Sequence, residues 1–328
     1  MNDNLPRFIC AITIAMSISV SVHAVPVIDL DSAEEFTPLI VASNNPYKWI
    51  APTPSILDGV GKLTLNRTDG SFGCSGSLLE GGGFMITAAH CVTDDEGNNV
   101  LNFADVSFQG GAVTTTASQA YIWSGWDGST VGINNDIAIL KLDTAVNSID
   151  GYEIATTEIF GSVVMHAGYG LTGTGSSGAH SGTFGTLHFG FNVYDAIWGG
   201  GSLAYDFDDG TAAHDAFCIA VGICGVGLSY PNESMIAPGD SGGGSFIWEG
   251  GELKLVGVHS FAATFGMTGG DIDQFLNSSF GEAAGDTYLL PYLAWIDTVT
   301  AVPEPKTYLM MLIGLLAVSA SIRKRKLA

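Results

Sequence analysis

Short segments in which apolar and polar residues alternate recur along this chain, and they restrict its fold more than any other feature. The segment 186–193 alternates apolar side chains with a period of two, and 62–67 repeats the pattern more briefly. The segment 254–261 is almost continuously apolar, as expected of a strand buried on both faces. Clusters of Gly, Ser, Asn and Asp between such segments predict turns. The sequence therefore predicts an all-β fold, with 288–299 as a single late helix.

A glycine pattern at Gly173-x-Gly175-x-x-Gly178 satisfies the fingerprint of dinucleotide-binding folds. That fingerprint requires a strand before it and a helix after it. The residues that follow are rich in glycine and alternate as a strand does. We therefore exclude a dinucleotide-binding domain.

Ser241 lies in the stretch PGDSGGG, residues 238–244, with four glycines around it and an acidic residue before it. Glycine lacks Cβ, so it adopts positive φ angles easily and lets another backbone approach closely. Glycine also weakens any strand that contains it. The stretch is therefore either a flexible loop or a loop in which another group must approach Ser241 very closely.

A serine hydroxyl is a weak nucleophile at neutral pH, and it needs a base that is itself oriented by a third group. His90 follows an apolar run in FMITAAHC, where Cys91 can fix the loop. Asp136 precedes the apolar run IAILKL, where a buried carboxylate is costly without a partner. An imidazole N–H is a suitable partner, so His90 and Asp136 are the candidates for the base and its orienting acid.

These stretches resemble the three signature blocks of the trypsin- and chymotrypsin-like serine proteases, in the family's order of His, Asp and Ser. Further blocks extend the resemblance over residues 55–298. The matching blocks are TAAHC (87–91), NDIAILKL (135–142), GDSGGG (239–244), CSGSLL (74–79), AGYG (167–170), VGVHSF (256–261) and YLAWI (292–296). The resemblance implies a fold of two six-stranded antiparallel Greek-key barrels with a short C-terminal helix.

The same resemblance implies a protease domain at 51–300, with a first barrel at about 51–150, a second at about 151–285 and a closing helix at 288–299. It implies that Ser241 attacks the scissile carbonyl of a protein or peptide, that His90 transfers the proton and that Asp136 orients His90. The backbone N–H groups of Gly239 and Ser241 would form the oxyanion hole. No cofactor and no metal ion is implied.

The resemblance also places a substrate pocket, lined by Met235, Ser260, Phe261 and Ala262. Met235 lies six residues before the nucleophile, where a preference for Arg or Lys would require an acid. Ala262 matches a wall position that is often glycine, which would narrow the pocket. We therefore expect cleavage after small or medium apolar residues.

The activation start of the family, a basic residue before an Ile-Val-Gly-Gly type N-terminus, is absent. The nearest candidate for a cut is Lys48-Trp49-Ile50, and it matches poorly. In the family the new amine pairs with the acid before the nucleophile, here Asp240. Residues 25–50 are therefore interpreted as a short propeptide of a zymogen or as a packed N-terminal arm.

Cysteine usage indicates an oxidising compartment. Removal of an N-terminal signal takes away Cys10 and leaves four cysteines, an even number. Of the three possible pairings, two local disulfides, Cys74–Cys91 and Cys218–Cys224, are the simplest. A zinc site that uses His214 beside Cys218 is a weaker alternative.

The two ends of the chain predict export. Residues 1–24 have the apolar run and small-x-small ending of a signal peptide. Residues 301–328 contain Val-Pro-Glu-Pro, an uncharged segment at 307–322 and a basic cluster. This order resembles the PEP-CTERM sorting signal of Gram-negative bacteria, which implies export machinery and an exosortase as partners. A plain membrane anchor, with the basic end in the cytoplasm, is the alternative.

The net charge of the chain excludes two classes of polyanionic partner. The chain has 33 acidic against 11 basic residues and a formal net charge of −22, and six of the basic residues lie in the two terminal segments. A body so acidic is unsuited to binding nucleic acid or an anionic membrane surface. We expect an exported monomer, located in the cell envelope or outside the cell, whose membrane contact is the C-terminal segment before processing.

Alternative functions were weighed against the peptidase. A binding or matrix protein on a protease-like scaffold usually lacks a member of the triad, and here all three residues are present. An α/β-hydrolase esterase also carries Gly-x-Ser-x-Gly, but its histidine follows the serine in the chain. The acidic segments 94–97 and 206–210 suggest Ca²⁺, but Phe217 occupies the twelfth position of an EF-type loop from Asp206, so that motif fails.

Overall fold

The computed structural model describes residues 25–26, 41–44, 49–128, 135–157, 159, 161–225, 227–228 and 230–301. The predicted signal peptide, part of the N-terminal lead-in and the predicted sorting signal after residue 301 lie outside the described residues. The chain divides into two compact units, Met1–Pro291 and Tyr292–Ala328. Within the described ranges, no helix has the length and apolar character needed to cross a membrane.

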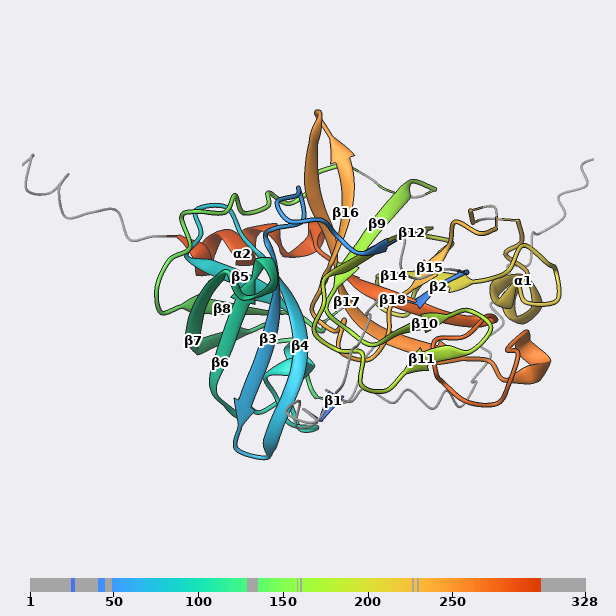
Figure 1. Ribbon diagram of the computed structural model, residues 1–328, viewed down its shortest axis with the longest axis horizontal. Coiled ribbons are helices and arrows are strands. Elements are labelled where there is room, and N and C mark those ends of the chain that lie inside the picture. Colours follow the sequence, from blue (N-terminus) through green and yellow to red (C-terminus); the bar gives the residue numbers. More distant parts are fainter. Residues whose placement is uncertain are drawn as a thin grey trace, which may run out of the picture. The chain divides into compact units, whose positions relative to one another are not determined.

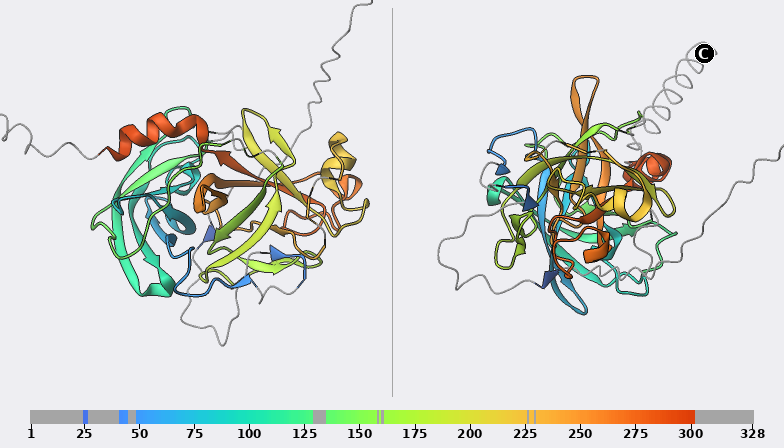
Figure 2. Two further views of the ribbon diagram at one scale, coloured as in Figure 1. Left: turned by 90° about the horizontal axis from the view of Figure 1, so that it is seen from above. Right: turned by 90° about the vertical axis from the view of Figure 1, so that its right-hand side faces the viewer.

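Six antiparallel strands form a closed barrel in the first half of the larger unit (Figures 1 and 2). The strand order is β4-β3-β6-β7-β8-β5, and a further pairing of β4 with β5 closes it. The strands are β3 (Val60–Arg67), β4 (Gly70–Leu78), β5 (Phe84–Thr87), β6 (Leu101–Phe108), β7 (Val113–Ile122) and β8 (Ala138–Leu142), with β1 (Val25–Pro26) added beside β4. Alternate side chains such as Leu63 and Leu65 point inward and are fully buried, as the period of two predicts.

A second sheet curls into a half-barrel in the other half of that unit. Its order is β12-β9-β16-β17-β18-β14-β13. The strands are β9 (Val163–Gly168), β12 (His188–Val193), β13 (Ala196–Trp198), β14 (Ser202–Phe207), β16 (Gly244–Glu249), β17 (Glu252–Thr264) and β18 (Glu282–Tyr288). The all-β class is thus confirmed: the first barrel is closed and six-stranded, and the second, called the second barrel below, is a seven-stranded half-barrel.

A third, four-stranded sheet flanks the second barrel, with the order β11-β10-β2-β15. Its strands are β2 (Val41–Ala42), β10 (Thr172–Thr174), β11 (Gly178–His180) and β15 (Ser234–Met235). The glycine pattern at 173–178 forms the β10–β11 hairpin, which confirms that it is no dinucleotide-binding loop. One strand of this sheet, β2, comes from the N-terminal lead-in.

The helices differ from the sequence prediction. The predicted helix at 288–299 was placed too early, because β18 continues to Tyr288 and a 3-10 turn, Leu290–Tyr292, contains Pro291. The helix α2 spans Leu293–Thr300. Proline lacks the N–H that an earlier helix would need.

A second helix, α1 (Ala216–Val221), was not predicted. Asp215 caps it by accepting a hydrogen bond of 2.8 Å from the Cys218 N–H. Further 3-10 turns among the described residues are η3 (Ala89–Cys91), η4 (Gln109–Gly111) and η5 (Met267–Gly269).

Candidate active site

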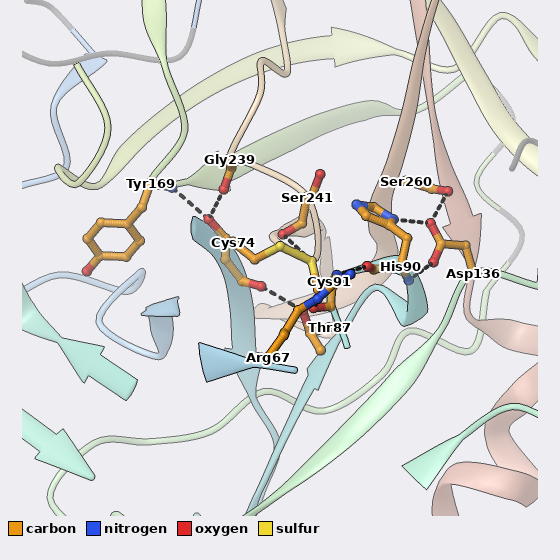
Figure 3. Close-up of a disulfide and its surroundings, with 11 residues drawn as sticks. Arg67, Cys74, Thr87, His90, Cys91, Asp136, Tyr169, Gly239, Ser241 and Ser260 are labelled. Carbon is orange, nitrogen blue, oxygen red and sulfur yellow. Dashed lines mark hydrogen bonds and ion pairs between the residues drawn. A yellow bond between two sulfur atoms is a disulfide. The ribbon is translucent and has the colours of Figure 1, made fainter. Parts of the chain in front are cut away.

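His90 is held at the end of β5 by its backbone, its ring and the next residue. It lies in η3 and is 8% exposed. Its backbone N–H donates to Asp136 Oδ1 at 2.9 Å, and its ring Nδ1 lies 2.7 Å from Asp136 Oδ2. A disulfide joins the following residue, Cys91, to Cys74. Both the position and the orientation of the imidazole are therefore fixed (Figure 3).

Asp136 is a buried residue whose carboxylate and backbone carbonyl both accept hydrogen bonds. It precedes β8 and is 1% exposed. Besides the two contacts from His90, its Oδ2 accepts a hydrogen bond of 2.7 Å from Ser260 Oγ, and its backbone carbonyl accepts one of 2.9 Å from Thr287 Oγ1. This network fixes the His90 tautomer with the proton on Nδ1, which leaves Nε2 as a proton acceptor.

Residues 238–244, called the nucleophile loop after the predicted role of Ser241, are held against the first barrel by two hydrogen bonds from Ser75. The Ser75 N–H donates to the Ser241 carbonyl at 2.8 Å, and Ser75 Oγ donates to the Gly239 carbonyl at 2.9 Å. A Cβ on Gly242 would come within 2.0 Å of Thr87 Oγ1. Close approach to the first barrel thus explains the glycine after Ser241. The bridging role of Ser75 was missed, because the sequence gives no signal for a hydroxyl that joins two distant loops.

Two backbone donors in this loop remain available. Gly239 has a φ of 95°, in the region that favours glycine. Within the described part of the chain, the N–H groups of Gly239 and Ser241 donate to no other group. His90 Nε2 likewise has no hydrogen-bond partner among described residues, and in Figure 3 the imidazole lies between Asp136 and Ser241. Hydrogen bonds to a nucleophile often form fully only when a substrate is bound.

Asp240 anchors the loop from inside the second barrel. Its carboxylate is fully buried and accepts hydrogen bonds from the backbone N–H groups of Gly170, at 2.7 Å, and Ala237, at 2.9 Å. Burial raises the pKa of Asp240 to about 6. A Cβ on Gly168 or Gly170 would come within about 2.5 Å of this carboxyl group, which explains the glycines of AGYG.

The four predicted pocket residues lie in two places. Met235 is in β15, fully buried in the core of the second barrel. Ser260, Phe261 and Ala262 follow one another in β17, and Ser260 donates its hydrogen bond to Asp136. Phe261 is 4% exposed, and Ala262 packs against the same core as Met235.

Both predicted disulfides are present, Cys74–Cys91 and Cys218–Cys224. The alternative zinc site is therefore wrong, because the Cys218 sulfur is bonded to Cys224. The first disulfide joins β4 to the turn that carries His90. The second lies within and just after α1.

A buried polar cluster behind the nucleophile loop was missed by sequence reasoning. Asp286 accepts hydrogen bonds from Ser245 Oγ, from the Tyr194 hydroxyl and from His259 Nδ1, the last at 2.9 Å. Although burial acts to raise it, the charge and hydrogen bond of His259 hold the pKa of Asp286 at about 2. His166 Nδ1 lies 2.8 Å from Ser245 Oγ.

Among the residues that the structure describes, two groups of potential metal ligands lie close together, but neither fits a metal ion. In the group Cys74, His90 and Cys91, both sulfurs belong to a disulfide. In the group His166, His259 and Asp286, hydroxyl and imidazole donors already surround the carboxylate. The second group is better explained as a hydrogen-bond network in the core, in which Nε2 of His166 and Nε2 of His259 have no partner among the described residues.

Comparisons with known proteins agree with this geometry. The model of a family described as Trypsin matches residues 60–275. Among solved structures, HL collagenase superposes with a TM-score of 0.51 at 16% sequence identity, and the match covers 78% of this chain and 98% of the collagenase. At that identity the match shows the fold alone.

Proposed function

Because the chain belongs to the trypsin family, we propose that it is a serine endopeptidase that uses Ser241, His90 and Asp136. His90 Nε2 removes the proton from Ser241 Oγ as the hydroxyl attacks the scissile carbonyl. An acyl-enzyme forms on Ser241, and His90 returns the proton to the leaving amine. Asp136 stabilises the imidazolium through the contact of 2.7 Å.

The observation that carries this proposal is the combination of an oriented imidazole with two unused backbone donors. The N–H groups of Gly239 and Ser241 are suited to bind the oxyanion of the tetrahedral intermediate. Loss of one such donor typically costs about 10²–10³ in rate. A binding protein on the same scaffold would have no need of this arrangement.

The test is hydrolysis of a protein substrate, such as casein, by the wild-type chain and two variants. Ser241→Ala should abolish hydrolysis above background. Ser118→Ala, which removes an exposed hydroxyl bonded to Asp143 at 2.7 Å, should leave it unchanged. A folded wild type that hydrolyses no protein would favour the binding-protein alternative.

For the substrate, we propose a preference for small or medium apolar residues before the cleaved bond. The support is that position 235 carries a methionine rather than an acidic residue, and that Phe261 and Ala262 are apolar as well. We assign Met235, Ser260, Phe261 and Ala262 to substrate binding. Cleavage of a peptide library, read by mass spectrometry, would overturn this preference if Arg or Lys dominated.

We also propose that the protein is exported and acts as a monomer in the cell envelope or outside the cell. Two disulfides support an oxidising compartment. The signal peptide, the exosortase-type sorting signal and transient membrane contact through 307–322 remain proposals from the sequence alone. The intact mass of the chain recovered from a Gram-negative host would show whether residues 1–24 and the tail are removed.

A further inference from the structure

The N-terminal lead-in contributes a strand to the sheet that supports the nucleophile loop. In β2, Val41 pairs with Met235 and Ala42 with Ser234 of β15. On its other side, Ala42 pairs with Thr174 of β10. Strand β2 is thus interior to its sheet, and β15 is at the edge (Figure 1). Among the described strands, β2 is the only one that forms a ladder with β15.

Hydrogen bonds and packing reinforce this pairing. Ser43 donates twice to the Glu233 carbonyl, from its N–H at 3.1 Å and from its Oγ at 2.9 Å. The Gly175 N–H donates to the Ala42 carbonyl at 2.9 Å. The Val41 side chain is fully buried in the same core cluster as Met235. These contacts are those of an integral strand.

From β15 the chain runs directly into the catalytic loop. Three residues separate Met235 from Gly239, and the Ala237 N–H in that span donates to the Asp240 carboxylate at 2.9 Å. The Asp240 N–H donates back to the Ala237 carbonyl at 2.9 Å. The position of β15 therefore helps to set where the Gly239 and Ser241 N–H groups point, together with the Ser75 hydrogen bonds to the carbonyls of the same two residues.

We propose that Val41–Ser43 is a built-in positioning strand, which holds the oxyanion loop in its working conformation in the uncleaved chain. This inference rests on the proposed function of Ser241. It means that no cut between residues 44 and 50 is needed for activity, and that the lead-in is a packed arm rather than a propeptide. Two backbone donors from within the fold, Gly170 and Ala237, already hold Asp240.

The experiment measures the rate at which a fluorophosphonate modifies Ser241, because that reaction needs both the base and the oxyanion donors. We expect the labelled wild-type chain, expressed from residue 25, to retain residues 41–43 by intact mass. A chain that begins at residue 45 should react about 100-fold more slowly or worse, as expected for a misplaced oxyanion donor. A synthetic peptide of residues 36–45 should restore its rate.

A matched pair of point variants keeps the test decisive if the truncated chain does not fold. Ser43→Pro removes both hydrogen bonds to the Glu233 carbonyl, whereas Ser43→Ala removes only the one from Oγ and keeps the one from the N–H. We expect Ser43→Pro to slow labelling at least about tenfold and Ser43→Ala to stay within about twofold of the wild type, at temperatures where both show native near-ultraviolet circular dichroism.

Two results would overturn the inference while leaving the proposed function intact. One is labelling of Ser43→Pro at the wild-type rate. The other is a wild type that reacts only after losing residues 41–43. A wild type that never reacts, with or without the arm, would instead contradict the proposed function, and the inference would fall with it.

Discussion

At the scale of single residues, the candidate site contains a glycine, Gly242, whose surroundings leave no room for a side chain. Gly242 follows the nucleophile with a φ of 80°, and a Cβ there would lie 2.0 Å from Thr87 Oγ1 and 2.4 Å from the Ser75 carbonyl. Gly250 also has a positive φ, of 66°, but a Cβ there would meet nothing within 4 Å. Comparing substitutions at these two positions therefore separates the effect of backbone strain from the effect of steric crowding.

We therefore expect Gly242→Ala to be far more damaging than Gly250→Ala. Both variants incur the cost of a left-handed backbone, about 1–2 kcal/mol. Only Gly242→Ala must also displace Ser75, so it should lose further stability and most of the activity. Urea unfolding and peptidase assays on the pair measure this, and equal losses in both variants would contradict the crowding argument.

The candidate catalytic residues could be assigned from the sequence because each lies in a contiguous block. His90, Asp136 and Ser241 were assigned on that basis, and the structure brings Asp136 and His90 into contact. The hydroxyls of Ser75 and Thr287 were not predicted, because their partners lie 164 and 151 residues away and no local pattern marks such contacts.

At the scale of elements, strands with clear alternation were predictable and short insertions were not. The strands β12 and β17 fall where the period of two and the apolar run placed them. Strand β2 is two residues long and α1 is six, too short for a period to show. Both are defined by their tertiary partners, namely β15 for β2 and the second barrel for α1.

Loss of each of the two disulfides should affect the stability and the activity of the protein to a different extent. Cys74–Cys91 closes a separation of 17 residues and Cys218–Cys224 one of six. Loop-closure entropy gives about 3 kcal/mol for the first and about 2 kcal/mol for the second. Replacing Cys74 and Cys91 by alanine should also reduce activity, because Cys91 follows His90.

The double variant Cys218→Ala/Cys224→Ala serves as the control, since no catalytic residue adjoins it. Chemical denaturation and peptidase assays on both double variants provide the comparison. A larger loss of activity in the Cys218/Cys224 variant would show that the first disulfide does not position His90.

At the scale of the whole molecule, buried titratable groups in the second barrel set the pH range of stability. Burial raises the pKa of Glu233 to about 8 and that of Glu282 to about 7. A raised pKa favours the folded state at low pH, and this stability is lost as pH rises from the ordinary value toward 7–8. Burial lowers the pKa of His166 and of His188 to about 3, so stability is also lost as pH falls below about 6.5.

The melting temperature should therefore peak at mildly acidic pH and decline toward pH 9. Glu233→Gln should weaken the alkaline decline, because the variant has no carboxyl group to ionise in the core. Its difference from the wild type should shrink as pH rises from about 5 to about 9. Melting curves across this range test the expectation, and a constant difference would contradict it.

The central claim is that Ser241 is an activated nucleophile, and covalent modification tests it most directly. The purified chain of residues 25–305 is treated with a fluorophosphonate, digested and analysed by mass spectrometry. The account predicts one adduct, located on the peptide that contains Ser241, and none in Ser241→Ala. A folded wild type without an adduct, or an adduct on another serine, would contradict the assignment of the site.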